Sequence, residues 1–174
     1  MPGWPRGRAL DGGIDEIPLP PGSTHGRLWL CGKHAVGPDP VAALARVGAD
    51  TIVCLTELRE LADRYPQYVE WLEVEHGRRA IRFPIADLHA PPLVAMETLI
   101  AQLRQRLDAG EGVVVHCGAG IGRAGTVATC LLMSLGMARD EALATVAMHR
   151  PMGGPEVGAQ RQLVDELAQR LSVD

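Results

Sequence analysis

A cysteine, three glycines and an arginine lie close together in the segment His116-Cys117-Gly118-Ala119-Gly120-Ile121-Gly122-Arg123. Apolar runs at 112–115 and 127–135 flank this segment, which predicts a turn between a buried strand and a buried helix. Glycines let the backbone curl tightly, so the N–H groups from Gly118 to Arg123 can point into one concavity and bind an anion. The N-terminus of the following helix adds partial positive charge at the same place. The pattern therefore predicts a phosphate site.

Cys117 and Arg123 stand at the two ends of this loop. The guanidinium of Arg123 is planar and can donate two parallel hydrogen bonds to a phosphate. The helix end and the arginine together favour a thiolate at Cys117, which makes the sulfur a nucleophile at neutral pH. A phosphate bound in the loop would lie directly over that sulfur. The alternative is that Cys117 is a small buried hydrophobe at the end of a strand.

A phosphate transfer to sulfur also needs an acid that protonates the leaving oxygen and, afterwards, a base that activates water. Asp87 lies 30 residues before Cys117, in a loop with prolines at both ends that spans 84–92. This loop leaves a predicted strand, so it should open at the same edge of the sheet as the cysteine loop. We expect Asp87 to be the acid and base, with His89 and then Asp63 as the next candidates. Capping of the helix that begins near residue 92 is the alternative role of Asp87.

The segment HCGAGIGRAGT resembles the His-Cys-x5-Arg signature of the cysteine-dependent phosphatases, in particular the compact dual-specificity branch that includes the cyclin-dependent-kinase-associated phosphatase and bacterial relatives. The resemblance covers about residues 26–171. It implies that Cys117 forms a phosphocysteine, that Arg123 binds the substrate and transition state, and that His116 tunes the thiol from the adjacent position. It also implies a phosphate-binding loop made of Gly118, Ala119, Gly120, Ile121, Gly122 and Arg123.

Parts of this family carry a glutamine that positions water, placed after an Arg-Pro segment that here is 150–151. Gln160 has the same helical phase as Leu163, Val164 and Leu167 and should face inward, whereas Gln162 lies about 200° further round the helix. We expect Gln160 to be this residue, with a buried amide bonded to backbone as an equal alternative.

The residue after the arginine departs from the family. Relatives usually have Ser or Thr there, whose hydroxyl donates to the cysteine sulfur, and this chain has Ala124. The loss of one hydrogen bond to the leaving thiolate should slow the hydrolysis of the phosphocysteine about tenfold.

Strand and helix signals alternate along the chain and predict the elements that hold these residues. Strands are expected at 28–31, 51–55, 80–83 and 112–115, and helices at 41–47, 57–75, 93–107, 127–135, 139–149 and 157–171. Such alternation predicts one α/β domain with a mostly parallel central sheet flanked by helices, as in the dual-specificity phosphatases. Residues 1–26, rich in proline and glycine, are expected to be a leader without folded structure, and 27–174 the phosphatase domain.

The composition limits the partners. The 174 residues are 47% hydrophobic and 3% aromatic, and 17 Lys and Arg against 21 Asp and Glu give a net charge of -4. A nucleic-acid interface needs basic and stacking side chains that this chain has few of, so no nucleic-acid partner is expected. No apolar run reaches 18 residues, which predicts no membrane partner and a cytoplasmic location.

The cysteines and histidines predict neither a disulfide framework nor a metal site. Cys31, Cys54, Cys117 and Cys130 have no regular spacing, so they are expected to be reduced thiols. Cys54 lies in a strand beside that of Cys117, and a reversible disulfide between them is one hypothesis, with an ordinary core role as the commoner one. Cys31 and His34 lack a second pair of ligands. We expect no metal and no cofactor.

The leading hypothesis is therefore a metal-independent phosphatase acting on phosphoprotein substrates, with phosphotyrosine and also phosphoserine or phosphothreonine as targets implied by the resemblance. The loop positions 118–122 carry no basic side chain, which disfavours inositol lipids. A rhodanese-like sulfurtransferase is a second hypothesis, since such enzymes also use a loop cysteine but need no acid. A non-catalytic phosphopeptide-binding module, suggested by Ala124, is a third.

Overall fold

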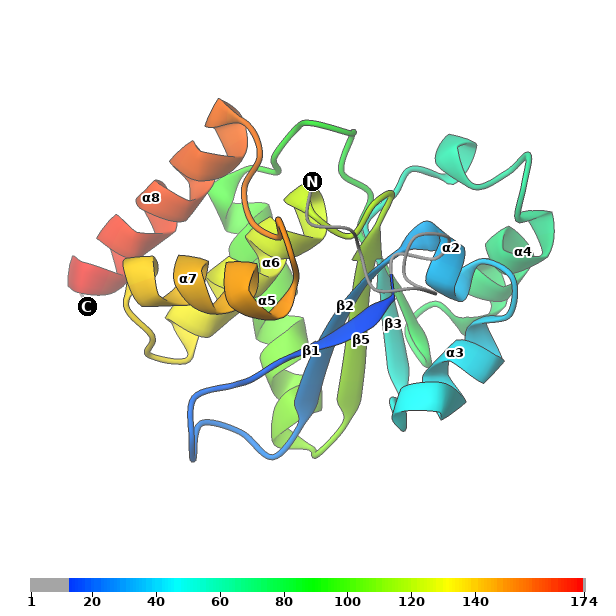
Figure 1. The fold of residues 1–174 in the computed structure, drawn as a ribbon, viewed down its shortest axis with the longest axis horizontal. Helices are drawn as coiled ribbons and strands as arrows, with labels where there is room; N and C mark the ends of the chain where they lie inside the picture. The colour runs from blue at the N-terminus through cyan, green and yellow to red at the C-terminus, as the bar shows by residue number, and fades with distance from the viewer. Residues whose placement is uncertain (1–12, 174) are drawn as a thin grey trace.

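The computed structural model describes residues 13–173, which form a five-stranded sheet with helices on both faces (Figure 1). The strand order is β1-β2-β5-β3-β4. Strand β1 pairs antiparallel with β2, and the other pairs are parallel. The strands are β1 (Ile14–Ile17), β2 (Arg27–Gly32), β3 (Thr51–Cys54), β4 (Ala80–Arg82) and β5 (Gly112–Cys117). The predicted single α/β domain with a mostly parallel sheet is confirmed.

The helices divide between the two faces of the sheet, with α5 to α8 over one face and α2 to α4 over the other (Figure 1). Their bounds are α2 (Lys33–Val36), α3 (Pro40–Val47), α4 (Pro66–Glu75), α5 (Leu93–Asp108), α6 (Gly122–Ser134), α7 (Arg139–His149) and α8 (Gly158–Val173), with a 3-10 turn η1 at Leu58–Glu60. The predicted helix at 57–75 is thus divided, because Pro66 starts a new helix at its first position.

Strand β5 is central and completely buried, as an all-apolar strand between two helical layers should be. Its residues alternate between the two cores: Val113, Val115 and Cys117 pack on the side of α5 to α8, and Val114 packs on the other. The cysteine loop, residues 117–123, follows the carboxyl end of this strand. In open α/β sheets, ligands bind in the crevice at this edge of the sheet. They bind beside a central strand whose two neighbours come from different parts of the chain, as β2 and β3 do for β5.

The expectation that residues 1–26 hold no folded structure is wrong for β1. Its four residues pair with β2 from Ile14↔Cys31 to Ile17↔Leu28. The strand has only four residues and three prolines follow it, at 18, 20 and 21. In the sequence, the prolines indicate a loop more strongly than these four residues indicate a strand. Pairing with one neighbour is enough for an edge strand. Residues 1–12 of the expected leader lie outside the described residues.

Helix α6 begins at Gly122, earlier than the predicted 127. Gly122 and Gly125 therefore belong to the first turn of the helix, where close packing requires glycine, and not to the loop. A Cβ added at Gly125 would lie 2.1 Å from the backbone nitrogen of Gly154, so only glycine fits where the chain after α7 crosses this helix. The helix N-terminus therefore points directly at the loop.

Candidate active site

The backbone carbonyls of the cysteine loop are held from outside by other parts of the fold. The N–H of Lys33, at the start of α2, donates to Gly118 O at 2.9 Å. Ile121 O accepts from the N–H of Gly154 at 3.1 Å and from that of Gly125 at 2.9 Å. Because the carbonyls are engaged on the outer side, the loop cannot turn them inward.

The N–H groups of residues 118–123 are left for an anion. Within residues 13–173, none of these N–H groups donates to a protein acceptor. Unpaired amides in a curled loop at a helix N-terminus are the usual means of binding phosphate. Cys117, at the base of the loop, is 2% exposed. The sulfur thus lies where the bound group would sit, and its access is limited to that group.

Arg123 is anchored by a carboxylate that the sequence did not point to. Its Nη1 and Nη2 donate to the two carboxylate oxygens of Glu60 at 2.9 and 2.8 Å, and Nη1 also donates to Ile85 O at 2.8 Å. Burial disfavours a charged Glu60, but the hydrogen bonds from Arg123 and from the N–H of Glu57 outweigh it, and the pKa of Glu60 is lowered. The two-pronged pair fixes the plane of the guanidinium beside the loop.

The sequence around Glu60 contains a local pattern, but that pattern indicates a helix cap and not a partner of Arg123. Glu57 and Glu60 form a capping box around η1, in which each side chain accepts from the backbone of the other. A sequence pattern can reveal such a cap, whereas the pairing with Arg123, 63 residues away, depends on the fold.

Asp87 lies in a turn that places its carboxylate beside Arg123. Its Oδ1 is 3.4 Å from Arg123 Nη2, and its side chain is 70% exposed. The turn is closed by the bond from the N–H of His89 to Ala86 O, and the His89 ring contacts Asp87 O. The capping alternative is excluded, because α5 begins after Pro92 without a side-chain cap. The carboxylate is therefore free to reach a group bound in the loop.

His116 lies on the opposite face of β5 from Cys117. Its Nε2 is 2.7 Å from the hydroxyl of Tyr68 and its Nδ1 is 3.2 Å from Cys117 O. A carbonyl only accepts, so Nδ1 carries the hydrogen and the Tyr68 hydroxyl donates to Nε2. The pKa of His116 is lowered to about 4, mainly because the ring is completely buried; the hydrogen bond to Cys117 O opposes this effect and the charge of Arg123 adds to it. This neutral ring contacts the backbone of Cys117, not its sulfur.

A family model described as the DSP-PTPase phosphatase domain of Swiss Army Knife proteins matches residues 26–166. The chain belongs to the dual-specificity phosphatase family. The matched region contains the cysteine loop, Asp87, Glu60 and Gln160. The predicted membership in the compact branch of this superfamily is confirmed.

Two curated relatives show the range of this family. The chain is 30% identical over 97 residues to dual specificity protein phosphatase 14 of Mus musculus, covering 55% of this chain and 47% of that protein. It is 34% identical over 98 residues to the phosphatidylinositol 3,4,5-trisphosphate 3-phosphatase and protein-tyrosine-phosphatase PTEN1 of Arabidopsis thaliana. This match covers 54% of this chain and 24% of that protein. The chain thus spans half or less of the length of these relatives.

Solved structures match over most of the chain. Tk-PTP in its active form is 29% identical, covers 87% of this chain and 99% of its own, and superposes with a TM-score of 0.68. The kinase associated phosphatase, at 21% identity, covers 93% of this chain and 97% of its own with a TM-score of 0.75, which shows the shared fold.

Gln160 faces inward, as its helical phase predicts, and is 1% exposed. Its amide is occupied at both ends: Oε1 accepts from the N–H of Glu156 at 2.8 Å, and Nε2 donates to His89 O at 3.2 Å. This is the alternative in which backbone satisfies the buried amide. Gln160 joins the start of α8 to the Asp87 turn in this phosphatase domain.

The structure contradicts the hypothesis of a disulfide between Cys54 and Cys117. Cys54 pairs in register with His116 and packs in the core on the side of α2 to α4, whereas Cys117 packs in the core on the other side. Their side chains therefore point to opposite faces of the sheet. The Cys54 sulfur lies 3.2 Å from the hydroxyl of Thr56. Burial raises the pKa of the Cys54 thiol, in keeping with an ordinary core residue.

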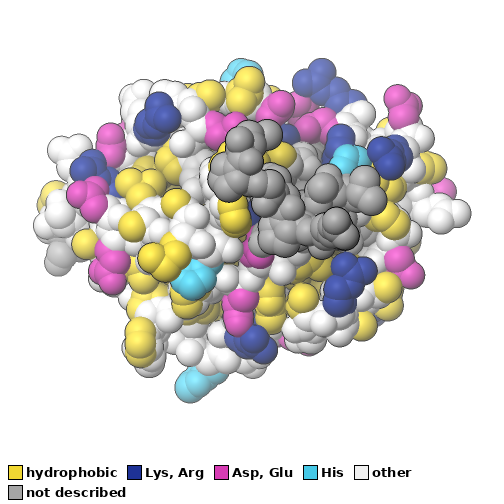
Figure 2. Space-filling view, in the orientation of Figure 1, with side chains coloured by type: hydrophobic (Ala, Val, Ile, Leu, Met, Phe, Trp, Pro, Cys, Tyr) yellow, Lys and Arg dark blue, Asp and Glu magenta, His cyan; other side chains and the backbone are white. Residues whose placement is uncertain are grey.

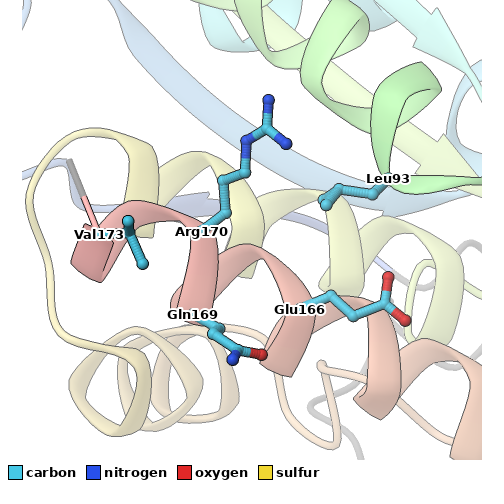
Figure 3. A pocket seen from close by; sticks show the side chains of 5 residues that line it. All are labelled: Leu93, Glu166, Gln169, Arg170 and Val173. Atoms are coloured by element: carbon cyan, nitrogen blue, oxygen red, sulfur yellow. The ribbon is translucent and has the colours of Figure 1, made fainter.

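A surface groove elsewhere on the domain does not belong to this site. It is lined by Leu93 at the start of α5 and by Glu166, Gln169, Arg170 and Val173 of α8 (Figure 3). These α8 residues lie toward the end of the helix opposite Gln160, and none of the predicted site residues lines the groove.

Charged side chains of both signs are interspersed on the face of the domain shown in Figure 2, and neither sign forms a continuous patch there. Among the described residues, no helix is long and apolar enough to cross a membrane. No group of His, Cys, Asp and Glu within 13–173 is placed to hold a metal ion.

Proposed function

We propose that this chain is a protein phosphatase that hydrolyses phosphotyrosine, and also phosphoserine or phosphothreonine, through a phosphocysteine on Cys117. The observation that carries the proposal is the set of N–H groups at 118–123 without protein acceptors, arranged between Cys117 and Arg123. Such a site favours binding of the tetrahedral dianion of a phosphate ester. Its hydrogen bonds to the equatorial oxygens become stronger in the transition state, as charge spreads over these oxygens.

In the first step the Cys117 sulfur attacks phosphorus, the bond from phosphorus to the substrate oxygen breaks, and Asp87 donates its proton to that oxygen. In the second step Asp87 takes a proton from water, the water oxygen attacks phosphorus, and the sulfur leaves as a thiolate with release of inorganic phosphate. The loop amides and Arg123 bind the equatorial oxygens in both steps. Glu60 keeps the guanidinium in the orientation that this binding requires.

The direct experiment is release of phosphate from para-nitrophenyl phosphate in the presence of a chelator. Turnover that persists with the chelator is expected, and the absence of any turnover would contradict the proposal. A panel of phosphopeptides and phosphoinositides then addresses the substrate. We expect turnover of the peptides, because positions 118–122 carry no basic side chain to bind a second lipid phosphate.

Replacing Asp87 with asparagine is expected to lower kcat for para-nitrophenyl phosphate about 100-fold, because the amide can neither donate nor take the proton. Asp63→Asn, an exposed aspartate on the turn before α4, serves as the matched control and should leave kcat unchanged. A sulfurtransferase needs no acid. Full activity of Asp87→Asn with thiosulfate and cyanide, together with no phosphate release by the wild type, would favour that alternative.

Ala124→Ser is expected to raise steady-state turnover severalfold while leaving the initial burst of leaving group unchanged. Ala124 is fully buried on the first turn of α6, and the hydroxyl of the nearby Thr126 donates to Gly122 O at 2.6 Å. A serine would add a donor for the leaving thiolate, which acts only in the second step. Rapid mixing that resolves burst from steady state checks this, and an unchanged or lower steady-state rate would count against it. A protein that only binds phosphopeptides would show no burst.

A further inference from the structure

Arg150 contacts the outer side of the cysteine loop although it lies 30 residues after it. Its side chain is fully buried where the chain leaves α7. Nη2 donates to Ala119 O at 2.9 Å, and Nε donates to Gly120 O at 3.0 Å. These are the two carbonyls in the middle of the loop that the N–H groups of Lys33, Gly125 and Gly154 do not reach.

The direction of a carbonyl decides the direction of the next N–H. A trans peptide is planar, with its C=O and N–H pointing to opposite sides. By holding Ala119 O and Gly120 O outward, Arg150 turns the N–H groups of Gly120 and Ile121 to the inner side of the loop. Gly120 has a φ of +73°, and a Cβ there would lie 2.3 Å from Cys31 O and 2.7 Å from Arg150 Nη2. The middle of the loop thus fits closely between β2 and this guanidinium.

The remaining side of the guanidinium is bound by β1 and by the residue that precedes this strand. Arg150 Nη1 donates to Asp15 Oδ2 at 2.8 Å and to Gly13 O at 3.3 Å. A buried charge requires a partner of opposite charge, and Asp15 supplies it. Asp15 is fixed in turn, because β1 pairs with β2 at Asp15↔Leu30 and β2 pairs with β5.

We propose that Arg150 is a positioning residue for the phosphate-binding loop and that Asp15 of β1 orients it. Arg150 acts through the backbone of the loop and touches neither the sulfur nor the bound phosphate. On this proposal β1, which the sequence assigned to a leader without folded structure, helps to position the phosphate-binding loop. Only the effect on catalysis rests on the proposed function; the effect on anion binding does not.

The test compares Arg150→Lys with the wild type in binding of tungstate, a tetrahedral oxyanion, and in turnover of para-nitrophenyl phosphate. Lysine keeps the charge but cannot hold two carbonyls in one plane. We expect tungstate binding to weaken about tenfold and kcat/KM to fall by at least as much, measured well below the unfolding temperature of the variant. Asp15→Asn should weaken tungstate binding about threefold, with recovery in Asp15→Glu.

Arg106→Lys is the matched control. Arg106 also donates to two carbonyls, those of Gly77 and Arg78. This side chain also contacts Thr51 at the start of β3, so it lies at the edge of the sheet opposite the loop. Its replacement should lower the unfolding temperature without changing tungstate affinity.

Three outcomes distinguish the ideas. If Arg150→Lys is less stable but binds tungstate as tightly as the wild type, Arg150 is merely structural and the proposal is overturned. If the wild type binds tungstate, Arg150→Lys binds it more weakly, and neither releases phosphate, the positioning role stands and the proposed function fails. A wild-type protein that binds no tungstate would overturn both.

Discussion

Replacing Cys117 with serine is expected to lower phosphate release from para-nitrophenyl phosphate by about 10⁴-fold or more. A serine hydroxyl is a far weaker nucleophile than a thiolate, and the neighbouring His116 cannot activate it, because both ring nitrogens of His116 are engaged with Tyr68 and with the carbonyl of residue 117. The loop amides and Arg123 remain in this variant. Binding of tungstate should therefore stay within a few-fold of the wild type while turnover is lost, which separates the nucleophile from the anion site.

Cys130→Ser is the control for this replacement. Cys130 lies on α6, the helix that follows the loop, and burial raises the pKa of its thiol to about 12, so it is an unreactive core residue. We expect this variant to lose some stability and to keep its turnover. Turnover that survives in Cys117→Ser and disappears in Cys130→Ser would contradict the assignment of the nucleophile.

Replacing Arg123 with lysine is expected to lower kcat and kcat/KM about 1,000-fold each. The ammonium keeps one positive charge but loses the planar fork that binds two equatorial oxygens. It also leaves Glu60 with fewer hydrogen bonds in a partly buried place, because both carboxylate oxygens accept from Arg123. The loss should appear in kcat because the oxygens carry more of the charge in the transition state than in the substrate.

Arg27→Lys is the matched control for Arg123→Lys. Arg27 also binds a glutamate with both of its prongs, Glu16 on the neighbouring strand, but this pair is exposed on the surface. We expect no change in turnover and little change in stability, because exposed ion pairs contribute little to the free energy of unfolding. An equal loss of activity in both variants would show that the effect of Arg123→Lys comes from general damage to the fold.

The cysteine loop could be predicted from the sequence because its determinants are contiguous. Strand, glycines, arginine and helix follow one another within 112–135, and each acts on its neighbours along the chain. The placement of Asp87 near Arg123 also followed from sequence, because parallel strands end at a common edge. Helical phase likewise predicted that Gln160 is buried, although not that backbone groups occupy its amide.

The partners of the loop could not be predicted, because they come from distant segments. The sequence pattern at Glu60 indicates a helix cap, and Asp15 lies in a short strand that is followed by prolines. Their carboxylates become partners of Arg123 and Arg150 only after the sheet has assembled. Alternation along β3 and β5 could have excluded the pair of Cys54 and Cys117, but only with the register between the strands, which the sequence does not contain.

Detection of a phosphocysteine on Cys117 is the most direct test of the proposed mechanism. Wild-type protein is mixed with para-nitrophenyl phosphate, quenched within the first turnover, and digested, and the peptides are examined by mass spectrometry. We expect one phosphate on the peptide that contains Cys117, at a level that matches the burst of para-nitrophenol, and none in Cys117→Ser. Turnover without phosphate on any residue, or with phosphate on a residue other than Cys117, would contradict the mechanism.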